Sequence, residues 1–227
     1  MLGVMNRPKI TLIDYGVGNL LSVQRGLEHC GAEVLITSDP GEVIAAKSVV
    51  LPGVGAFAKA MDALHSRGLV EAITKLGQLG TPLLGICLGM QLLLDESEEF
   101  GVTKGLGLIS GRVVPIPTRT LHNEAQKIPN IGWNSLVISE SYCNWRGSIF
   151  QDIIPGEATC FVHSFMSLTS KASHCLAEFN YGGHRIPAVI AKNNVIGCQF
   201  HPEKSGEVGL KILRHFCVNY QPPQHHN

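Results

Sequence analysis

The chain has 227 residues, and charged side chains make up only 16% of them, against roughly 25% in an average soluble domain. Its 18 acidic and 18 basic residues cancel, and hydrophobic residues reach 44%. This balance excludes intrinsic disorder, which needs low hydrophobicity and high net charge. A neutral chain without a run of Lys and Arg also has no electrostatic attraction for nucleic acid or an anionic membrane.

The seven cysteines predict free thiols in a reducing compartment. Their number is odd, their spacings are wide and no C-x-x-C pair occurs, so neither a disulfide framework nor a zinc site is expected. The N-terminus lacks the apolar segment of a secretory signal. We therefore expect a cytoplasmic protein without a metal, with an N-terminal extension over 1–8, a single domain over 9–220 and a polar tail over 221–227.

Short apolar runs alternate with helical periodicity in the first half of the chain. Four runs are expected to form strands: 10–14, 34–36, 48–51 and 83–86. Three segments with apolar residues at helical spacing are expected to form helices: 20–27, 57–64 and 69–76. Continuous apolar strands separated by amphipathic helices are typical of a parallel sheet covered on both faces. The sequence therefore predicts an α/β fold with an open, mostly parallel twisted sheet.

The second half contains more strand-like runs: 113–114, 136–138, 161–162, 188–190 and 195–196. A last helix is expected from about Ser205, with these residues buried: Val208, Ile212, Leu213 and Phe216. The polar segment 118–127 is expected to be a loop.

The stretch 76–94 has no charged residue and is long enough to cross a membrane. Pro82 and four glycines interrupt it, however, and divide it into turn, strand and helix. A buried parallel strand with its following helix explains this stretch better than a membrane span.

Gly85-Ile86-Cys87-Leu88-Gly89 follows the G-x-C-x-G pattern of a nucleophile elbow. A sharp strand-to-helix turn strains the central residue, and the flanking glycines remove side chains that would clash. The thiol then lies at a helix N-terminus, where the dipole favours a thiolate, and the Leu88 N–H points to where an oxyanion would form. The alternative is a small cysteine of the core, but the glycines and the strand–helix context favour a nucleophile.

A cysteine nucleophile needs a base and a group that orients this base. His201 and Glu203 follow the predicted strand at 195–196 and are separated by one proline. This spacing lets the carboxylate hold one imidazole nitrogen while the other faces a thiol. The usual interpretation of a lone histidine is a surface or core residue, but here strand, proline and glutamate coincide.

Two glycine-rich turns follow predicted strands. In the turn after 48–51, Gly53 and Gly55 flank Val54, so backbone N–H groups can turn toward an anion as in an oxyanion hole. The turn at 16–18 starts like a dinucleotide fingerprint, but Leu21 occupies the position of the third glycine. No dinucleotide cofactor is therefore expected.

The segments 85–91 and 201–205 resemble the class I, or triad, glutamine amidotransferases. Within this class, five blocks are similar to the glutaminase subunits of imidazole glycerol phosphate synthases: 15–19, 51–55, 132–134, 161–164 and 200–205. The resemblance covers nearly the whole chain and implies a flavodoxin-like core. Two positions depart from the family pattern, Asn130-Ile131 in place of His-Met and Cys160 in place of an aromatic residue. Both lie on or near the side that the family uses for coupling to a partner.

The resemblance also implies roles for individual residues. Cys87, His201 and Glu203 would be the catalytic triad that hydrolyses L-glutamine through a glutamyl thioester, without a cofactor. The implied oxyanion donors are the backbone groups of Gly53, Val54, Gly55 and Leu88. The implied glutamine-binding residues are Gln91, His163, Ser164 and Phe165. The implied partner contacts are Asn19, Trp133 and Lys204.

The same resemblance implies a heterodimer with a (β/α)₈ cyclase that receives ammonia through an internal channel and makes imidazole glycerol phosphate and AICAR in histidine biosynthesis. A chain of this size has no room for an acceptor domain, and free ammonia would be protonated at pH 7, so docking is expected. One alternative is a paralogous glutaminase that supplies a cell-surface-sugar amidotransferase. Another is a non-catalytic interaction module with the same fold, which the intact triad disfavours.

Overall fold

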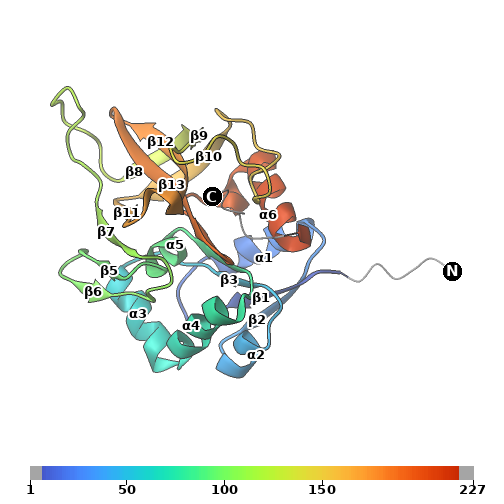
Figure 1. The fold of residues 1–227 in the computed structure, drawn as a ribbon. Coiled ribbons are helices and arrows are strands. Elements are labelled where there is room, and N and C mark those ends of the chain that lie inside the picture. Colours follow the sequence, from blue (N-terminus) through green and yellow to red (C-terminus); the bar gives the residue numbers. More distant parts are fainter. Residues whose placement is uncertain (1–6, 220–227) are drawn as a thin grey trace.

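The computed structural model describes residues 7–219, and its main element is an eight-stranded sheet (Figure 1). The strand order is β2-β1-β3-β4-β14-β13-β12-β9. The first five strands pair in parallel: β2 (Glu33–Thr37), β1 (Lys9–Ile13), β3 (Val49–Leu51), β4 (Leu83–Ile86) and β14 (Val195–Cys198). The other three extend the sheet in antiparallel pairs: β13 (His184–Lys192), β12 (Cys175–Tyr181) and β9 (Val137–Ile138). The predicted fold class is confirmed.

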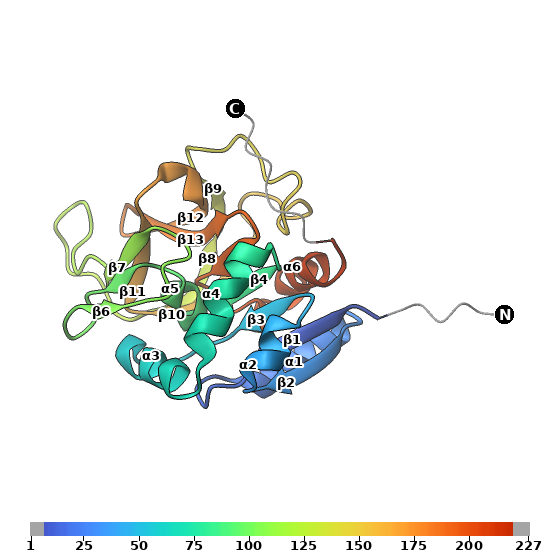
Figure 2. The same cartoon turned by 60° about the horizontal axis from the view of Figure 1, so that its bottom comes forward.

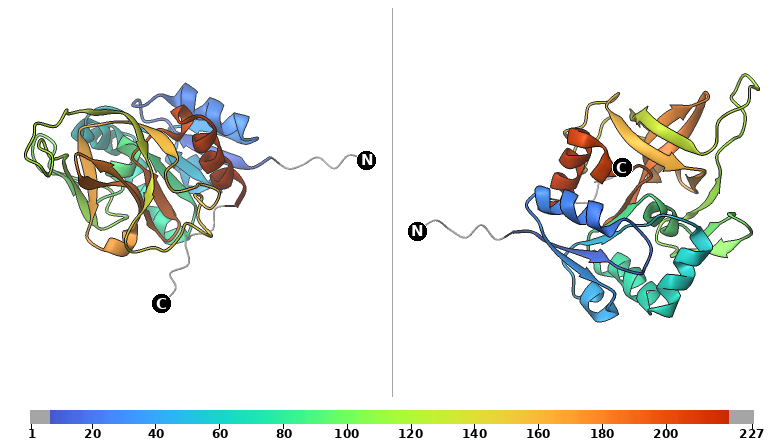
Figure 3. Two further views of the ribbon diagram at one scale, coloured as in Figure 1. Left: turned by 90° about the horizontal axis from the view of Figure 1, so that it is seen from above. Right: turned by 180° about the vertical axis from the view of Figure 1, so that it is seen from behind.

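Helices cover both faces of the parallel part and bury two separate cores. On one face, α1 (Leu20–His29) packs beside α6 (Gly206–Asn219), as the view from behind shows (Figure 3). The other face is covered by α2 (Pro40–Ile44), α3 (Phe57–Ser66), α4 (Leu69–Leu79) and α5 (Leu88–Leu92). Successive side chains of β4 point to opposite faces of the sheet. Leu84 and Ile86 therefore belong to the first core and Leu83 to the second.

Two smaller sheets lie on the side away from the N-terminal strands (Figure 2). One pairs β8 (Asn130–Ser135) with β10 (Ala158–His163). The other has the order β11-β7-β5-β6 and contains β11 (Phe165–Thr169), β7 (Gly111–Pro115), β5 (Glu96–Ser97) and β6 (Thr103–Lys104). Short 3₁₀ turns form η1 (Ala172–His174) and η2 (Pro202–Lys204).

The predicted strands and helices are present, with some corrections. The run 136–138 is shorter than expected, because only 137–138 belong to β9 and Leu136 lies between β9 and the end of β8 at Ser135. Val208 was expected to be buried but is only half-buried at the edge of its core. The elements α2, β5, β6, β8, β11 and β12 were not predicted.

The segment 118–127 projects from the body of the molecule as a loop (Figure 1), as predicted. The stretch 76–94 contains the end of α4, then β4 and α5, and no helix among residues 7–219 is long and apolar enough to cross a membrane. The expected tail over 221–227 and most of the expected extension over 1–8 lie outside the described residues.

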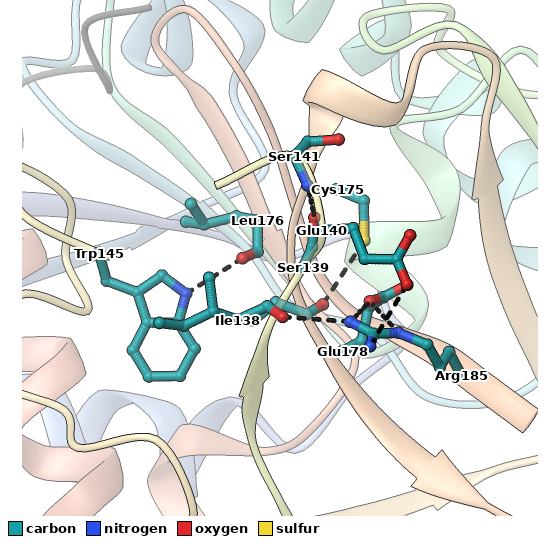
Figure 4. A network of polar contacts seen from close by, with 10 residues as sticks. Ile138, Ser139, Glu140, Ser141, Trp145, Cys175, Leu176, Glu178 and Arg185 are labelled. Atoms are coloured by element: carbon teal, nitrogen blue, oxygen red, sulfur yellow. Dashed lines mark hydrogen bonds and ion pairs between the residues drawn. The ribbon is translucent and has the colours of Figure 1, made fainter. Parts of the chain in front are cut away.

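A polar network fastens the antiparallel end of the main sheet (Figure 4). The Arg185 guanidinium donates from Nε to Glu178 at 2.8 Å and from Nη2 to the carbonyl oxygen of Ile138 at 3.1 Å. Trp145 Nε1 donates to the carbonyl oxygen of Leu176 at 3.0 Å. These bonds hold the edge strand β9, and the segment that follows it, against β12.

Candidate active site

The carboxyl ends of β4 and β14 lie side by side, and this adjacency assembles the site. Ile86 is paired with Cys198, and the Cys87 N–H donates to the Cys198 carbonyl oxygen at 2.8 Å. Cys87 directly follows β4, and Gln199 to His201 directly follow β14. Ligands in open α/β sheets bind outside the carboxyl ends of the strands, so this edge is the expected place for chemistry.

Cys87 occupies a strained turn between β4 and α5. Its φ of 55° and ψ of −109° are unfavourable for a residue with a side chain. The flanking glycines are required by close backbone approach. A Cβ on Gly89 would lie 1.9 Å from the Leu51 carbonyl oxygen, and one on Gly85 would lie 2.7 Å from the Gly89 backbone. The local geometry is that of a nucleophile elbow.

His201 lies between Cys87 and Glu203. Its Nδ1 is 2.8 Å from Glu203 Oε1, and the ring shares a hydrogen bond with the Cys87 thiol. Burial on its own lowers the pKa of His201, but the hydrogen bonds and charges of Cys87 and Glu203 outweigh it and raise this pKa above its ordinary value. The arrangement therefore favours the imidazolium form of His201.

The turn that carries His201 is tied to β10. The His201 N–H donates to the Cys160 carbonyl oxygen at 2.9 Å, and the Ser205 hydroxyl donates to the His201 carbonyl oxygen at 2.7 Å. The Ser205 oxygen also accepts from the Cys160 N–H at 3.0 Å. Sequence reasoning gave Ser205 no role, although its position four residues after His201 suits such a bridge.

A pocket of about 400 Å³ opens at this edge of the sheet. Ten of the predicted site residues line it: Val54, Gly55, Cys87, Leu88, Gln91, His163, Ser164, Phe165, His201 and Lys204. Three further residues line it that the sequence did not single out: Glu99, Pro129 and Val162. Among the described residues, Gly53, Glu203, Asn19 and Trp133 lie outside this lining.

The backbone around Leu88 differs from the prediction. The Leu88 N–H donates to the Gly53 carbonyl oxygen at 3.3 Å and is not free for an oxyanion. Tyr15 holds the same turn, because its hydroxyl donates to the Pro52 carbonyl oxygen at 2.7 Å. The expectation of a free donor is therefore wrong for this conformation, since the close packing of Gly53 against the elbow places its carbonyl there.

Glu99 is the lining carboxylate that sequence reasoning missed. It follows β5, and its Oε2 accepts from the backbone N–H of Phe57 at 2.6 Å, at the start of α3. Two adjacent glutamates in a charged loop carry no distinctive spacing, so only the fold brings Glu99 to the pocket.

His163 is buried, and its environment holds it neutral. Its Nδ1–H donates to the Phe165 carbonyl oxygen at 2.8 Å, and its Nε2 accepts from Asn130 Nδ2 at 3.1 Å. Burial lowers the pKa of His163 to about 4, with a smaller contribution from the charge of His201. The departure Asn130 thus has a structural role as a donor to this ring.

Acid should destabilise the protein through His163. Between pH 6.5 and 4 the unfolded chain binds a proton at this ring that the folded protein does not bind, so the free energy of unfolding falls as the pH falls. We expect about 1.5 kcal/mol of loss from this group between pH 6.5 and 5. Denaturant unfolding of the wild type and of His163→Gln at these two pH values should show a smaller loss in the variant. An equal loss in both would contradict this assignment.

The predicted docking residues are exposed. Asn19 caps α1, where its Oδ1 accepts from the Ser22 N–H at 3.3 Å. Trp133 on β8 is 60% exposed, and so is its neighbour Ile131 at 62%. In the register of β8 with β10, Ile131 lies opposite Val162 and Trp133 opposite Cys160. These four side chains form an apolar face that reaches the rim of the pocket at Val162.

No group of three or more His, Cys, Asp or Glu within residues 7–219 is arranged to hold a metal ion.

Comparisons with known proteins agree on one family. The family model of class-I glutamine amidotransferases matches residues 11–220. The imidazole glycerol phosphate synthase subunit HisH 1 of Legionella pneumophila (strain Lens) is 47% identical over 91% of this chain and 97% of its own length. The synthase subunit HisH of Geobacillus sp. (strain WCH70) is 48% identical over 91% and 95%.

Solved structures show the same fold at low sequence identity. A chain in the structure of PurLQS from Thermotoga maritima superposes with a TM-score of 0.68, is 19% identical and matches over 95% of this chain and 99% of its own. The fold, the family model and the close relatives together show that this chain belongs to the class I glutamine amidotransferases and, within them, to the HisH family of imidazole glycerol phosphate synthase subunits.

Proposed function

We propose that this chain is the glutaminase subunit of an imidazole glycerol phosphate synthase. It hydrolyses L-glutamine to glutamate and passes ammonia to a (β/α)₈ synthase subunit, which makes imidazole glycerol phosphate and AICAR in histidine biosynthesis. The observation that carries the proposal is the Cys87–His201–Glu203 arrangement at the mouth of a pocket of amino-acid size. The names of the relatives support the choice of pathway over a sugar amidotransferase.

The proposed reaction has two steps at one sulfur atom. Cys87 Sγ attacks the side-chain amide carbon of glutamine, and His201 receives the thiol proton and gives it to the departing nitrogen, which leaves as ammonia. His201 then removes a proton from a water molecule, which hydrolyses the γ-glutamyl thioester to glutamate and restores the thiol. Glu203 holds the imidazole and stabilises its charged form throughout.

The charges around the pocket suit a zwitterionic amino acid. Glu99 provides a carboxylate for the α-ammonium group, and Lys204 provides an ammonium for the α-carboxylate. Gln91, His163, Ser164 and Phe165 add uncharged groups to the same lining. Glutamine therefore fits this lining better than a singly charged substrate does.

The oxyanion site requires a change at Gly53. The tetrahedral intermediate needs donors that aim at its oxygen, and the Leu88 N–H is bound to the Gly53 carbonyl oxygen instead. Turning the Gly53–Val54 peptide would free Leu88 and present a second N–H group. We assign this peptide rotation to partner binding. Without the partner the oxyanion site is incomplete, so the isolated subunit hydrolyses glutamine slowly.

The partner is proposed to dock on the apolar face of Ile131, Trp133, Cys160 and Val162, with Asn19 and Lys204 as further contacts. An exposed face of this kind is typical of the centre of a protein–protein interface. Its position at the pocket rim would let ammonia leave the site without entering bulk water.

Glutamate release with and without the partner tests the function. We expect the chain alone to release glutamate slowly, and the purified synthase subunit with its nucleotide ligand to accelerate release about 10²-fold or more, the effect of a completed oxyanion hole. Folded protein without release in either condition would contradict an enzymatic function. Acceleration by a sugar amidotransferase, but not by the synthase subunit, would favour the paralogous pathway.

Charge placed on the docking face separates docking from catalysis. Trp133→Asp should remove the acceleration and leave the slow basal release, because the docking face then carries an unpaired charge. The matched control is Leu79→Asp. Leu79 is an exposed leucine at the end of α4, which leads to the amino-terminal end of β4, whereas the pocket lies at the carboxyl ends of the strands. If the partner accelerated glutamate release equally in the two variants, Trp133 would not be part of the interface.

A further inference from the structure

Gln199 is a fully buried polar side chain at the centre of the site, and the triad gives it no role. It follows β14 directly. Its Nε2 donates toward Cys87 Sγ at 3.8 Å, and its Oε1 accepts from Gln91 Nε2 at 3.0 Å. One amide thus touches both the proposed nucleophile and a wall of the pocket.

The contact between Gln199 and Gln91 determines which end of the Gln91 amide faces the ligand. Gln91 Nε2 carries two hydrogens and has two acceptors, Gln199 Oε1 at 3.0 Å and the Phe165 carbonyl oxygen at 3.3 Å. Both donors are therefore used within the protein, and only Gln91 Oε1 can accept a hydrogen bond from a ligand. If Gln91 turned over, its oxygen would face two other acceptors.

The contact with Cys87 acts on the sulfur. A thiolate accepts hydrogen bonds far better than a thiol, so a neutral N–H aimed at Sγ favours the reactive form. The donor is rigidly placed, because the Gln199 backbone N–H donates to the Ala188 carbonyl oxygen at 2.8 Å and the side chain has no exposed surface. His201 contacts the same sulfur, so two donors would share the charge.

We propose that Gln199 is a positioning residue of this site, which fixes the Gln91 amide for glutamine and supplies a second donor to the Cys87 thiolate. The inference rests on the proposed glutaminase function. The role of Gln199 differs from those of the triad residues, because this one side chain would link substrate binding to nucleophile activation.

Two substitutions separate the two contacts. Gln199→Leu removes both, so the KM for glutamine should rise about tenfold and the alkylation of Cys87 by iodoacetamide at pH 7 should slow about tenfold, as for one lost hydrogen bond each. Gln199→Glu keeps the acceptor for Gln91 but opposes a thiolate. Its KM should stay within about twofold, while kcat falls and the pH profile of alkylation moves upward by about one unit.

Alkylation is followed by peptide mass spectrometry of the chain alone, with the exposed Cys143 as the internal reference. KM and kcat are measured on the complex with the synthase partner. The matched control is Asn194→Leu, a buried amide just before β14 at its other end, whose Nδ2 donates to the Leu76 and Thr81 carbonyl oxygens. It should lower the melting temperature without changing the relative rate at Cys87.

The outcomes separate the inference from the function on which it rests. Wild-type rates and pH profiles in both Gln199 variants would overturn the inference, and so would equal effects of Asn194→Leu. If Gln199→Leu does not fold, the isosteric Gln199→Glu decides by its split between KM and kcat and by its alkylation profile. A wild type that releases no glutamate would contradict the glutaminase function, whereas the alkylation rates would still test the contact between Gln199 and Cys87.

Discussion

Replacement of Cys87 by alanine should abolish glutamine-dependent synthesis in the complex and leave synthesis from added ammonium salts intact. The sulfur is the atom that attacks the amide, and removing a covalent nucleophile from a triad costs about 10⁴-fold or more in rate. Ammonia supplied in solution bypasses this step, because the acceptor reaction takes place on the partner. Both activities are measured on the same purified complex, with glutamine or with an ammonium salt as the nitrogen source.

The control for this experiment is Cys143→Ala, the same substitution at an exposed thiol. It should change neither activity. If Cys87→Ala also lost the ammonium-dependent activity while the complex stayed intact, Cys87 would be needed for the structure or for the ammonia path. Retention of glutamine-dependent synthesis would identify another nucleophile.

The parallel half of the fold was predictable because its strands are buried on both faces. Runs such as 83–86 contain only residues that such a strand permits, and the glycines after them mark the turns. The elbow was predictable because its pattern is local: Gly85, Cys87 and Gly89 are close in sequence. His201 and Glu203 were recognisable as a pair because one proline fixes their spacing.

The remaining features depend on contacts between distant segments. Gln199 acts by reaching Cys87 and Gln91, more than 100 residues earlier in the chain, and no local pattern indicates this. Glu99 reaches the pocket only because two-residue strands place its loop beside α3. The hydrogen bond of Leu88 to Gly53 was missed because a motif predicts which groups surround an anion, but not which conformation the empty site adopts.

Replacement of Gly89 by alanine should cost about 3 kcal/mol or more of the free energy of unfolding and remove the glutaminase activity. The added Cβ would lie 1.9 Å from the Leu51 carbonyl oxygen, which belongs to the central strand β3 and cannot move aside as a side chain could. Relief of this contact would push α5 away from the sheet and turn Cys87 away from His201. Chemical denaturation measures the stability, and glutamate release by the partner complex measures the activity.

Gly77→Ala is the matched control, because Gly77 also lies inside a helix, α4. Its Cβ would meet only the end of the Leu108 side chain, which can rotate away. Alanine in a helix is otherwise favoured over glycine by about 1 kcal/mol, so Gly77→Ala should be neutral or stabilising. A comparably mild effect of Gly89→Ala would mean that the elbow can relax. The strain at Cys87 would then not depend on close packing of α5 against β3.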